Sequence, residues 1–229
     1  MNVLSLFDGI SCGMLAMKRA GIECNHYYAS EIDKYAIEVS RRNFPDIVRL
    51  GDITKLDCLK LNDIDIVIGG SPCQSFSRSG DNTGFEGKSG LFYEYLRCLN
   101  EVKPRWFLLE NVVMKKEWEN QISQFLGVSP VMIDSAMFSA QKRQRLYWTN
   151  IPFDKNIPDM NISISDIYTS GYHKVINNHP VIIKNDNGVF YVRNATKIGF
   201  ATAHDGDCVN LEVPNSKTRR GRVSQGKTN

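Results

Sequence analysis

Residues 3–13 read VLSLFDGISCG, a short apolar run that is followed by an aspartate at position 8 and by glycines at positions 9 and 13. The run predicts a buried β-strand over Val3–Phe7 that ends at Asp8-Gly9, and a helix over Met14–Ala20. A strand, a glycine-containing turn and a helix open a doubly wound α/β sheet, where ligands bind at the carboxyl ends of the strands. The glycine spacing is not Gly-x-Gly-x-x-Gly, so a dinucleotide site is not favoured, and the turn could also be purely structural.

The same alternation of short β-rich runs and helical stretches continues through the first two-thirds of the chain. It predicts further strands at Tyr27–Ser30, Ile47–Leu50, Ile64–Ile68, Trp106–Leu109, Val131–Ile133 and Leu146–Trp148. It predicts further helices at Ile32–Asn43, Leu91–Val102 and Glu117–Leu126. The pattern is typical of an α/β fold with a doubly wound sheet, and the apolar run at 64–68 belongs in the middle of it.

After Pro152 the composition shifts toward Asn, Asp, Gly and Pro. Short β-like pieces appear there at Lys174–Ile176, Val181–Lys184 and Val189–Val192. We therefore predict a first domain over residues 1–152 and a small, β-rich and loop-rich appendage over residues 153–229.

Composition places the chain among ordinary globular proteins, with 229 residues, 42% hydrophobic and 23% charged. It contains no apolar run long enough to cross a bilayer, and the start lacks a basic leader, so we expect a cytoplasmic protein. The six cysteines are scattered without a Cys-x-x-Cys pair. This argues against a disulfide framework and against a zinc site, and we expect no metal.

Positive charge gathers near the carboxyl end of the sequence. Residues 216–229 contain no acid and five cations, Lys217, Arg219, Arg220, Arg222 and Lys227. Without them the formal charge of +3 would become negative, so the cationic character is local. A segment of this kind is expected of a protein that contacts phosphates, although a frayed basic tail would look the same.

Acidic residues follow the second and third predicted strands, as Asp8 follows the first. Glu31 is placed to accept hydrogen bonds from both hydroxyls of a ribose, or else is an acid favoured by the dipole at a helix start. Asp52, in Gly51-Asp52-Ile53-Thr54, could accept from an adenine amino group, or else caps a turn. Because these strand ends share one edge of the sheet, the three features together predict an adenosine-containing ligand.

Two further segments carry residues suited to chemistry. Residues 69–77 read GGSPCQSFS, which places Cys73 in a polar, Gly- and Pro-rich loop where a thiol can be exposed and activated. Glycines at 80, 84, 87 and 90 suit a loop that closes over a substrate. The fifth strand delivers Glu110, a partly desolvated candidate acid. The alternatives are an inert buried cysteine and a salt-bridged structural acid.

In this order, these segments resemble the cytosine-5 DNA methyltransferase family. The resemblance rests on Phe7-Asp8-Gly9 with Gly13, on Glu31, on Gly51-Asp52, and on SPCQSFS at 71–77, ENV at 110–112 and QKRQR at 141–145. The segments GLFYEY at 90–95 and PVMID at 130–134 look like the animal de novo enzymes, whereas 194–229 looks more like phage and bacterial members. The match covers residues 1 to about 150 well and the rest loosely.

The resemblance implies a Rossmann-like methyltransferase sheet that binds S-adenosylmethionine, with S-adenosylhomocysteine as product, and that acts on double-stranded DNA. It places the cofactor along Phe7, Asp8, Gly9, Ile10, Ser11, Gly13, Glu31, Ile32, Asp52, Ile53, Thr54 and Pro72.

The resemblance also implies catalytic roles. The Cys73 thiolate would attack carbon 6 of a flipped-out cytosine while Glu110 protonates ring nitrogen 3. Arg145 would hold the carbonyl oxygen at position 2, and Arg143 would help to order the active-site loop. The alternative for both arginines is phosphate contact only.

The sequence also departs from the family pattern. We find neither the Pro-x-Glu-containing segment nor the Gly-Asn-containing strand and helix that follow the recognition region in the family, and residues 217–229 resemble only the opening of that region. We therefore expect either an enzyme completed by a second protein chain or a largely inactive remnant. The rival functions are a methyltransferase-like subunit that only binds DNA or a partner, and a tRNA cytosine-5 methyltransferase.

Overall fold

The computed structural model describes residues 1–72, 90–169, 175–176, 179–184, 187–211 and 216–224. The chain divides into two compact units. Unit 1 comprises residues 1–133 and 145–153, and unit 2 comprises residues 134–144 and 154–229. Unit 2 thus includes a short excursion from the first part of the chain, and the domain boundary at 152/153 stays a prediction.

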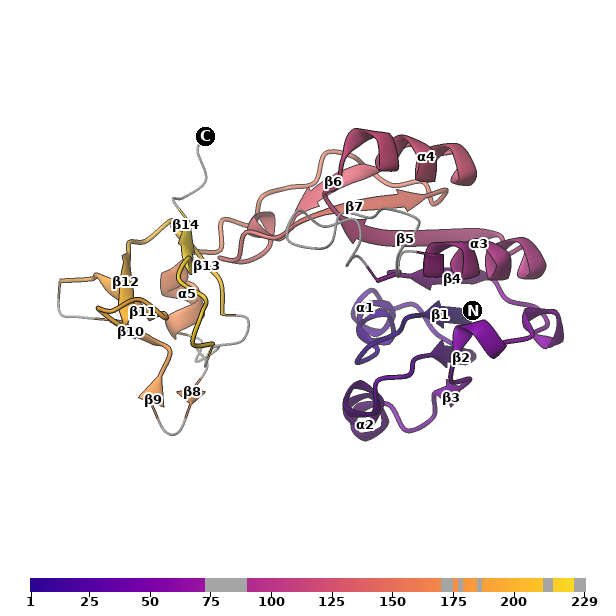
Figure 1. Ribbon diagram of the computed structural model, residues 1–229, viewed down its shortest axis with the longest axis horizontal. Helices are drawn as coiled ribbons and strands as arrows, with labels where there is room; N and C mark the ends of the chain where they lie inside the picture. The colour runs from indigo at the N-terminus through magenta and orange to yellow at the C-terminus, as the bar shows by residue number, and fades with distance from the viewer. Residues whose placement is uncertain (73–89, 170–174, 177–178, 185–186, 212–215, 225–229) are drawn as a thin grey trace. The chain divides into compact units, whose positions relative to one another are not determined.

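Unit 1 is built on a seven-stranded sheet, and Figure 1 shows its strands in the order β3-β2-β1-β4-β5-β7-β6. The strands are β1 (Asn2–Leu6), β2 (His26–Ser30), β3 (Val48–Arg49), β4 (Ile66–Gly69), β5 (Trp106–Val112), β6 (Val131–Asp134) and β7 (Gln144–Thr149). The pairs from β3 through β5 are parallel, and β7 runs antiparallel to β5. The predicted doubly wound α/β sheet is confirmed, with β1 and β4 at its centre.

Helices pack on both faces of this sheet because successive strand residues point to opposite sides. The helices are α1 (Cys12–Arg19), α2 (Lys34–Asn43), α3 (Leu91–Val102) and α4 (Lys116–Leu126). On one face Val3 and Ile66 form a core with methionines of α1. On the other face Leu4, Val67 and Leu109 pack with buried side chains of α3 and α4.

Most element boundaries differ from the sequence-based expectation by one to three residues, and the second helix and the third strand are examples. The second helix begins at Lys34 rather than Ile32, because the side chain of Asp33 accepts hydrogen bonds from the backbone N–H groups of Tyr35 and Ala36 and caps the helix. The third strand keeps only Val48–Arg49 of the predicted four residues.

Unit 2 is β-rich, as predicted, and is organised around a three-stranded antiparallel sheet of β10 (Ile182–Lys184), β11 (Phe190–Arg193) and β12 (Phe200–Ala203). Its other elements are α5 (Ile164–Thr169) and the strand pairs β8 (Val175–Ile176) with β9 (His179–Pro180) and β13 (Cys208–Val209) with β14 (Val223–Ser224). Ile164, Phe190 and Val192 are fully buried in its core. The strands β9, β12, β13 and β14 were not predicted, because each is short and lies among turn residues.

Within the basic segment, Arg222 is only 2% exposed, and its Nη1 donates to the carbonyl oxygen of Asn210 at 2.9 Å. Burial, followed by the charge of Arg219, lowers the pKa of this guanidinium. The prediction that this stretch contacts phosphates is therefore wrong for Arg222, which fastens β14 beside β13. A frayed tail is also wrong for residues 216–224, since the backbone N–H of Ala195 donates to the carbonyl of Arg219.

Cysteine environments vary along the described chain. Cys58, Cys98 and Cys208 are buried, Cys24 is partly buried and Cys12 is exposed. Cys73 lies outside the described residues. Among the helices in the described ranges, none combines the length and apolar character needed to cross a membrane.

Tyr95 of α3 is fully buried, and its hydroxyl has no hydrogen-bond partner among the groups that the structure describes. Burial raises the pKa of this phenol. The unfolded chain therefore releases the proton near the usual value of about 10, while the folded chain keeps it. Stability that is fully present below pH ~10 is lost as the pH rises above it.

We expect Tyr95→Phe to weaken this alkaline loss of stability, measured by urea unfolding between pH 8 and pH 11. At pH 8 the variant is expected to be at least as stable as the wild type, because it removes an unpaired buried hydroxyl. Tyr35→Phe is the control, since Tyr35 is 71% exposed. An identical pH profile for wild type and Tyr95→Phe would contradict the prediction.

Candidate functional site

The loop between β1 and α1 has an unusual backbone. Phe7, Gly9 and Ser11 all adopt left-handed conformations, with φ of 58°, 61° and 64°. For Phe7 and Ser11 this conformation is strained, and such strain persists only where surrounding contacts enforce it. Two backbone hydrogen bonds contribute, from Asp8 to the carbonyl of Ser30 and from Ser11 to the carbonyl of Asp8, both at 3.1 Å.

Side-chain contacts hold Asp8 inside this loop. Its Oδ1 accepts from the Tyr27 hydroxyl at 2.8 Å, and its Oδ2 accepts from the Ser11 hydroxyl. Gly13 leaves room for the tyrosine, because a Cβ at this position would lie 2.6 Å from the Tyr27 oxygen and 2.4 Å from Cδ1 of Ile68. Three of the predicted cofactor residues, Asp8, Ser11 and Gly13, thus shape the loop through contacts within the protein.

Glu31, at the end of β2, is joined to the same loop. Its Oε2 accepts from the backbone N–H of Gly9 at 2.7 Å, and its Oε1 accepts from the N–H groups of Ile32 and Asp33, both at 2.8 Å. The carboxylate therefore does organise the approach to α2, as the helix-start alternative predicted. An ionised carboxylate has about four acceptor positions, so capacity remains for a ligand hydroxyl.

The segment after β3 forms the third part of this edge. Oδ1 of Asp52 accepts from the backbone N–H and the hydroxyl of Thr54, at 3.0 and 2.9 Å, and caps the short helix η1 (Ile53–Lys55). The Thr54 backbone N–H first, and its hydroxyl second, lower the pKa of Asp52. The carboxylate is therefore ionised at neutral pH and able to accept a hydrogen bond.

Exposed apolar side chains stand among these polar groups. Ile10 is 48% exposed and Ile32 is 73% exposed. Each lies directly after a polar segment at the end of a strand. Because β1, β2 and β3 are neighbours in the sheet, their carboxyl ends form one edge. This edge combines backbone groups, carboxylates and exposed isoleucines, a mixture that suits a ligand with both a sugar and a flat apolar ring.

Arg97 of α3 was not predicted from the sequence. Its Nη2 donates to the carbonyl of Ile53 at 2.9 Å, so it supports the segment that contains Asp52. Ion pairs with Glu94 and Glu101, at 2.8 and 2.9 Å, hold the guanidinium in place. The spacing of three and four residues between these charges was the available signal.

Glu110 of β5 forms an ion pair with Arg145 of β7, with 2.8 Å between Oε1 and Nε. In the antiparallel register Glu110 is opposite Tyr147 and Val112 is opposite Arg145, so the two charged side chains are diagonal neighbours on one face. Both are partly exposed, at 33% and 18% of the side chain. The salt bridge predicted as the alternative is therefore present. It is made by Oε1 of Glu110, and Oε2 lies outside this contact.

The end of β4 lies directly beside this carboxylate. A Cβ added at Gly70 would be 3.0 Å from Oε2 of Glu110, so the glycine permits the close approach. The next residue, Ser71, is buried, and its carbonyl and hydroxyl oxygens lie 3.3 Å from Nδ2 of the buried Asn111. The chain is thus fixed next to Glu110 as it enters Pro72. Cys73, the following residue, lies outside the described part.

Arg143 belongs to unit 2, whereas Glu110 and Arg145 belong to unit 1. The backbone of Arg143 is well fixed, since its N–H donates to Oδ1 of Asp134 at 2.9 Å and its carbonyl accepts from Ser135. The structure therefore brings Glu110 and Arg145 together and does not join Arg143 to them.

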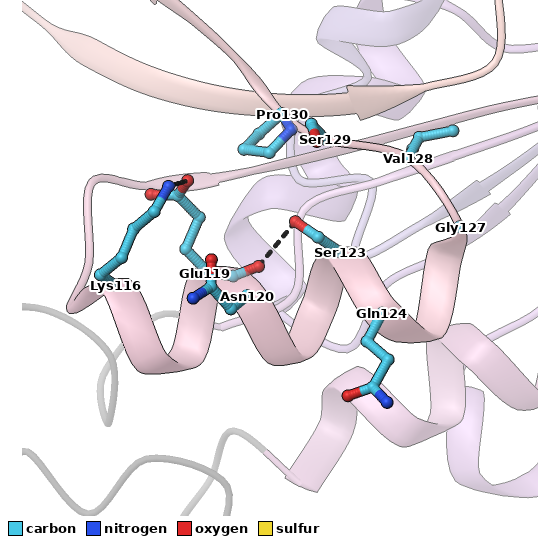
Figure 2. A pocket seen from close by; sticks show the side chains of 9 residues that line it. All are labelled: Lys116, Glu119, Asn120, Ser123, Gln124, Gly127, Val128, Ser129 and Pro130. Atoms are coloured by element: carbon cyan, nitrogen blue, oxygen red, sulfur yellow. Dashed lines mark hydrogen bonds and ion pairs between the residues drawn. The ribbon is translucent and has the colours of Figure 1, made fainter.

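Figure 2 shows a groove of about 570 Å³ elsewhere on unit 1, along α4 and the segment that follows it. Lys116, Glu119 and Ser123 line it, and the polar groups of all three side chains are engaged, in the ion pair of Lys116 with Glu119 and the hydrogen bond of Ser123 to the Glu119 carbonyl. None of the predicted site residues lines this groove, so its size alone does not make it the active site. No cluster able to hold a metal ion occurs among the side chains that the structure describes.

Comparison with known proteins adds to this geometry. Orphan methyltransferase M.Rho11sI of Bacillus phage rho11s is 44% identical over 115 residues, which is 49% of this chain and 23% of that protein. Type II methyltransferase M1.ScrFI of Lactococcus lactis subsp. cremoris is 36% identical over 158 residues, 64% of this chain and 40% of that protein. The chain thus spans less than half the length of these curated relatives.

A crystal structure described as a DNA modification methyltransferase encoded within an E. coli prophage shares the fold. It has a TM-score of 0.60 and 22% sequence identity, and the match covers 86% of this chain and 61% of that one. Residues 1–191 match the family described as C-5 cytosine-specific DNA methylase. The seven-stranded sheet with its antiparallel β7, the segments at the strand ends and this match over most of the sequence agree, and the chain belongs to the C-5 cytosine-specific DNA methylase family.

Proposed function

We propose that this chain transfers a methyl group from S-adenosylmethionine to carbon 5 of a cytosine in double-stranded DNA, with Cys73 as the nucleophile. The observation that carries the proposal is the placement of Glu110. Its carboxylate is held by Arg145 on one side and lies within contact distance of Gly70 on the other, three residues before Cys73. The strand that precedes the Cys73 segment, β4, is the direct neighbour of β5, which carries Glu110.

The chemistry requires both groups, because carbon 5 of cytosine is a poor nucleophile until the ring loses its aromaticity. The Cys73 thiolate forms a bond to carbon 6 while Glu110 donates a proton to ring nitrogen 3, which neutralises the developing charge. Carbon 5 then takes the methyl group, and loss of its proton breaks the carbon–sulfur bond and releases Cys73. In this proposal Arg145 contacts the base oxygen at position 2, and Arg143 orders the surrounding loop. The target base has to leave the duplex stack first.

The edge formed by β1, β2 and β3 is the proposed cofactor site. S-adenosylmethionine supplies an electrophilic methyl group when bound. The remaining acceptor capacity of Glu31 suits a ribose hydroxyl, and the ionised Asp52 suits an adenine amino group. The exposed side chain of Ile32 suits one face of the adenine ring.

A second candidate function is a methyltransferase-like subunit that binds DNA or a partner chain and is active only with that partner. In the two relatives compared above, the aligned residues make up 23–40% of the length, so the activity of a whole enzyme is a proposal for this chain. A second chain that supplies further segments of the family stays a prediction.

The covalent step predicts an adduct that survives denaturation. We expect one when the protein and S-adenosylmethionine are incubated with duplex DNA that contains 5-fluorocytosine, because the fluorine blocks the final elimination. Gel mobility under denaturing conditions measures it. Cys73→Ser is expected to abolish the adduct, and Glu110→Gln to slow its formation by at least ~10²-fold, the typical contribution of a general acid.

The control is Cys12→Ser, which removes a thiol that is exposed in the structure. An adduct that persists in Cys73→Ser would refute the assignment of the nucleophile. An adduct that forms only after a second chain, corresponding to the remaining length of a relative, is added would establish the subunit alternative.

The cofactor site predicts a specific role for Ile32. We expect Ile32→Ser to weaken S-adenosylmethionine binding about tenfold, since burial of an isoleucine against an apolar ring contributes ~1–3 kcal/mol. Thermal stability should not change, because the side chain is exposed in the free protein. Isothermal titration calorimetry measures the affinity.

Ile198→Ser is the matched control, since Ile198 in unit 2 is also 73% exposed. Equal affinities for wild type and Ile32→Ser would place the adenine elsewhere.

A further inference from the structure

A chain of four polar side chains runs beneath the β1–α1 loop. It begins at Arg49 of β3, whose Nη2 is 3.1 Å from the hydroxyl oxygen of Ser40 in α2. The Ser40 oxygen is 2.6 Å from the hydroxyl oxygen of Ser11, which in turn is hydrogen-bonded to Oδ2 of Asp8. This series of hydrogen bonds therefore connects β3 and α2 with the β1–α1 loop, which is far from both in the sequence.

The direction of every hydrogen bond follows from the two ends. An ionised Asp8 only accepts, so the Ser11 hydroxyl donates to it. The single hydroxyl proton of Ser11 is then used, so Ser11 accepts from Ser40. Arg49 only donates and supplies the remaining contact to the Ser40 oxygen. All donors point toward the carboxylate, and bonds aligned in this way polarise and strengthen one another.

The middle of this chain is sealed from solvent. Ser11 is 0% exposed and Ser40 is 2% exposed, so water cannot readily replace a lost hydroxyl there. The guanidinium of Arg49 is itself fixed, since it also donates to the carbonyl oxygens of Ile47 and Phe44 at 2.8 and 3.0 Å. The contacts of Ser40 with Ser11 and Arg49 therefore account for a polar side chain on the buried side of α2.

We propose that Ser40 and Arg49 are positioning residues for the cofactor loop. They hold Ser11 in its left-handed conformation and, through it, fix the carboxylate of Asp8. Arg49 lies three residues before Asp52, so the same chain of contacts ties the first and third segments of the cofactor edge together. Neither residue is among those proposed to contact the ligand, and the inference rests on the proposed function only in calling this loop the cofactor loop.

The first experiment needs no cofactor. Hydrogen exchange, followed by mass spectrometry, measures the amides of residues 7–15 in the full-length protein. We expect exchange about tenfold faster in Ser40→Ala than in the wild type, because Ser11 loses its buried donor and the loop opens more often. Ser123→Ala is the matched control. It also removes a helix serine with two hydrogen bonds, from Trp148 and to the Glu119 carbonyl, but in α4.

The second experiment measures S-adenosylmethionine binding by calorimetry. We expect Ser40→Ala to raise Kd about tenfold and Ser123→Ala to leave it within twofold, with thermal stability similar in the two variants. Ser11→Ala is expected to have a similar effect, and the double variant Ser11→Ala/Ser40→Ala to be no worse than either, because both break one chain.

The outcomes separate the two proposals. Unchanged exchange at residues 7–15 in Ser40→Ala, or equal changes in Ser123→Ala, would overturn the positioning role. Additive losses of affinity in the double variant would also overturn it. Faster exchange in Ser40→Ala together with a wild-type protein that does not bind S-adenosylmethionine would support the positioning of the loop and refute the cofactor site instead.

Discussion

The antiparallel pairing of β7 with β5 is the constraint on which the pairing of Glu110 with Arg145, the proposed catalytic acid and its partner, depends. It places Arg145 diagonally across from Glu110 on the same face of the sheet, within 2.8 Å. A parallel strand at this position would present its side chains in a different register and would separate the two charges. The core on the opposite face, where Trp148 and Leu109 are completely buried, locks that register. Packing on one face thus determines polar geometry on the other.

The edge formed by β1, β2 and β3, the proposed cofactor site, contains carboxylates that already serve the fold. Asp8, Glu31 and Asp52 each accept hydrogen bonds from nearby groups of the protein, so each carboxylate has partners without a ligand. These contacts fix the orientation of each carboxylate before a ligand arrives. A preorganised site loses less conformational entropy on binding, which is the general route by which a rigid loop raises affinity.

Sequence patterns predicted most of the unit 1 sheet, since alternation, glycine turns and apolar runs are local signals. They also predicted that acids would follow β2 and β3. They could not predict the partners of these acids. Ser40 looks like an ordinary polar helix residue, and only the fold brings it to Ser11. The segment that contains Arg222 was expected to contact phosphates, because composition does not reveal that this side chain is only 2% exposed. The short strands of unit 2 were not predicted, because each contains too few residues to show an alternating apolar pattern.

The close contacts around Gly13 have a consequence for protein engineering. A methyl group at this position would force the ends of the Tyr27 and Ile68 side chains to move, and residues of α2 and β3 support the adjacent β1–α1 loop. The β1–α1 loop is therefore not a self-contained module. A chimera that imports only the stretch around Phe7 from a relative would arrive without its braces, whereas one that also carries over the matching residues of the neighbouring helix and strand would keep its shape.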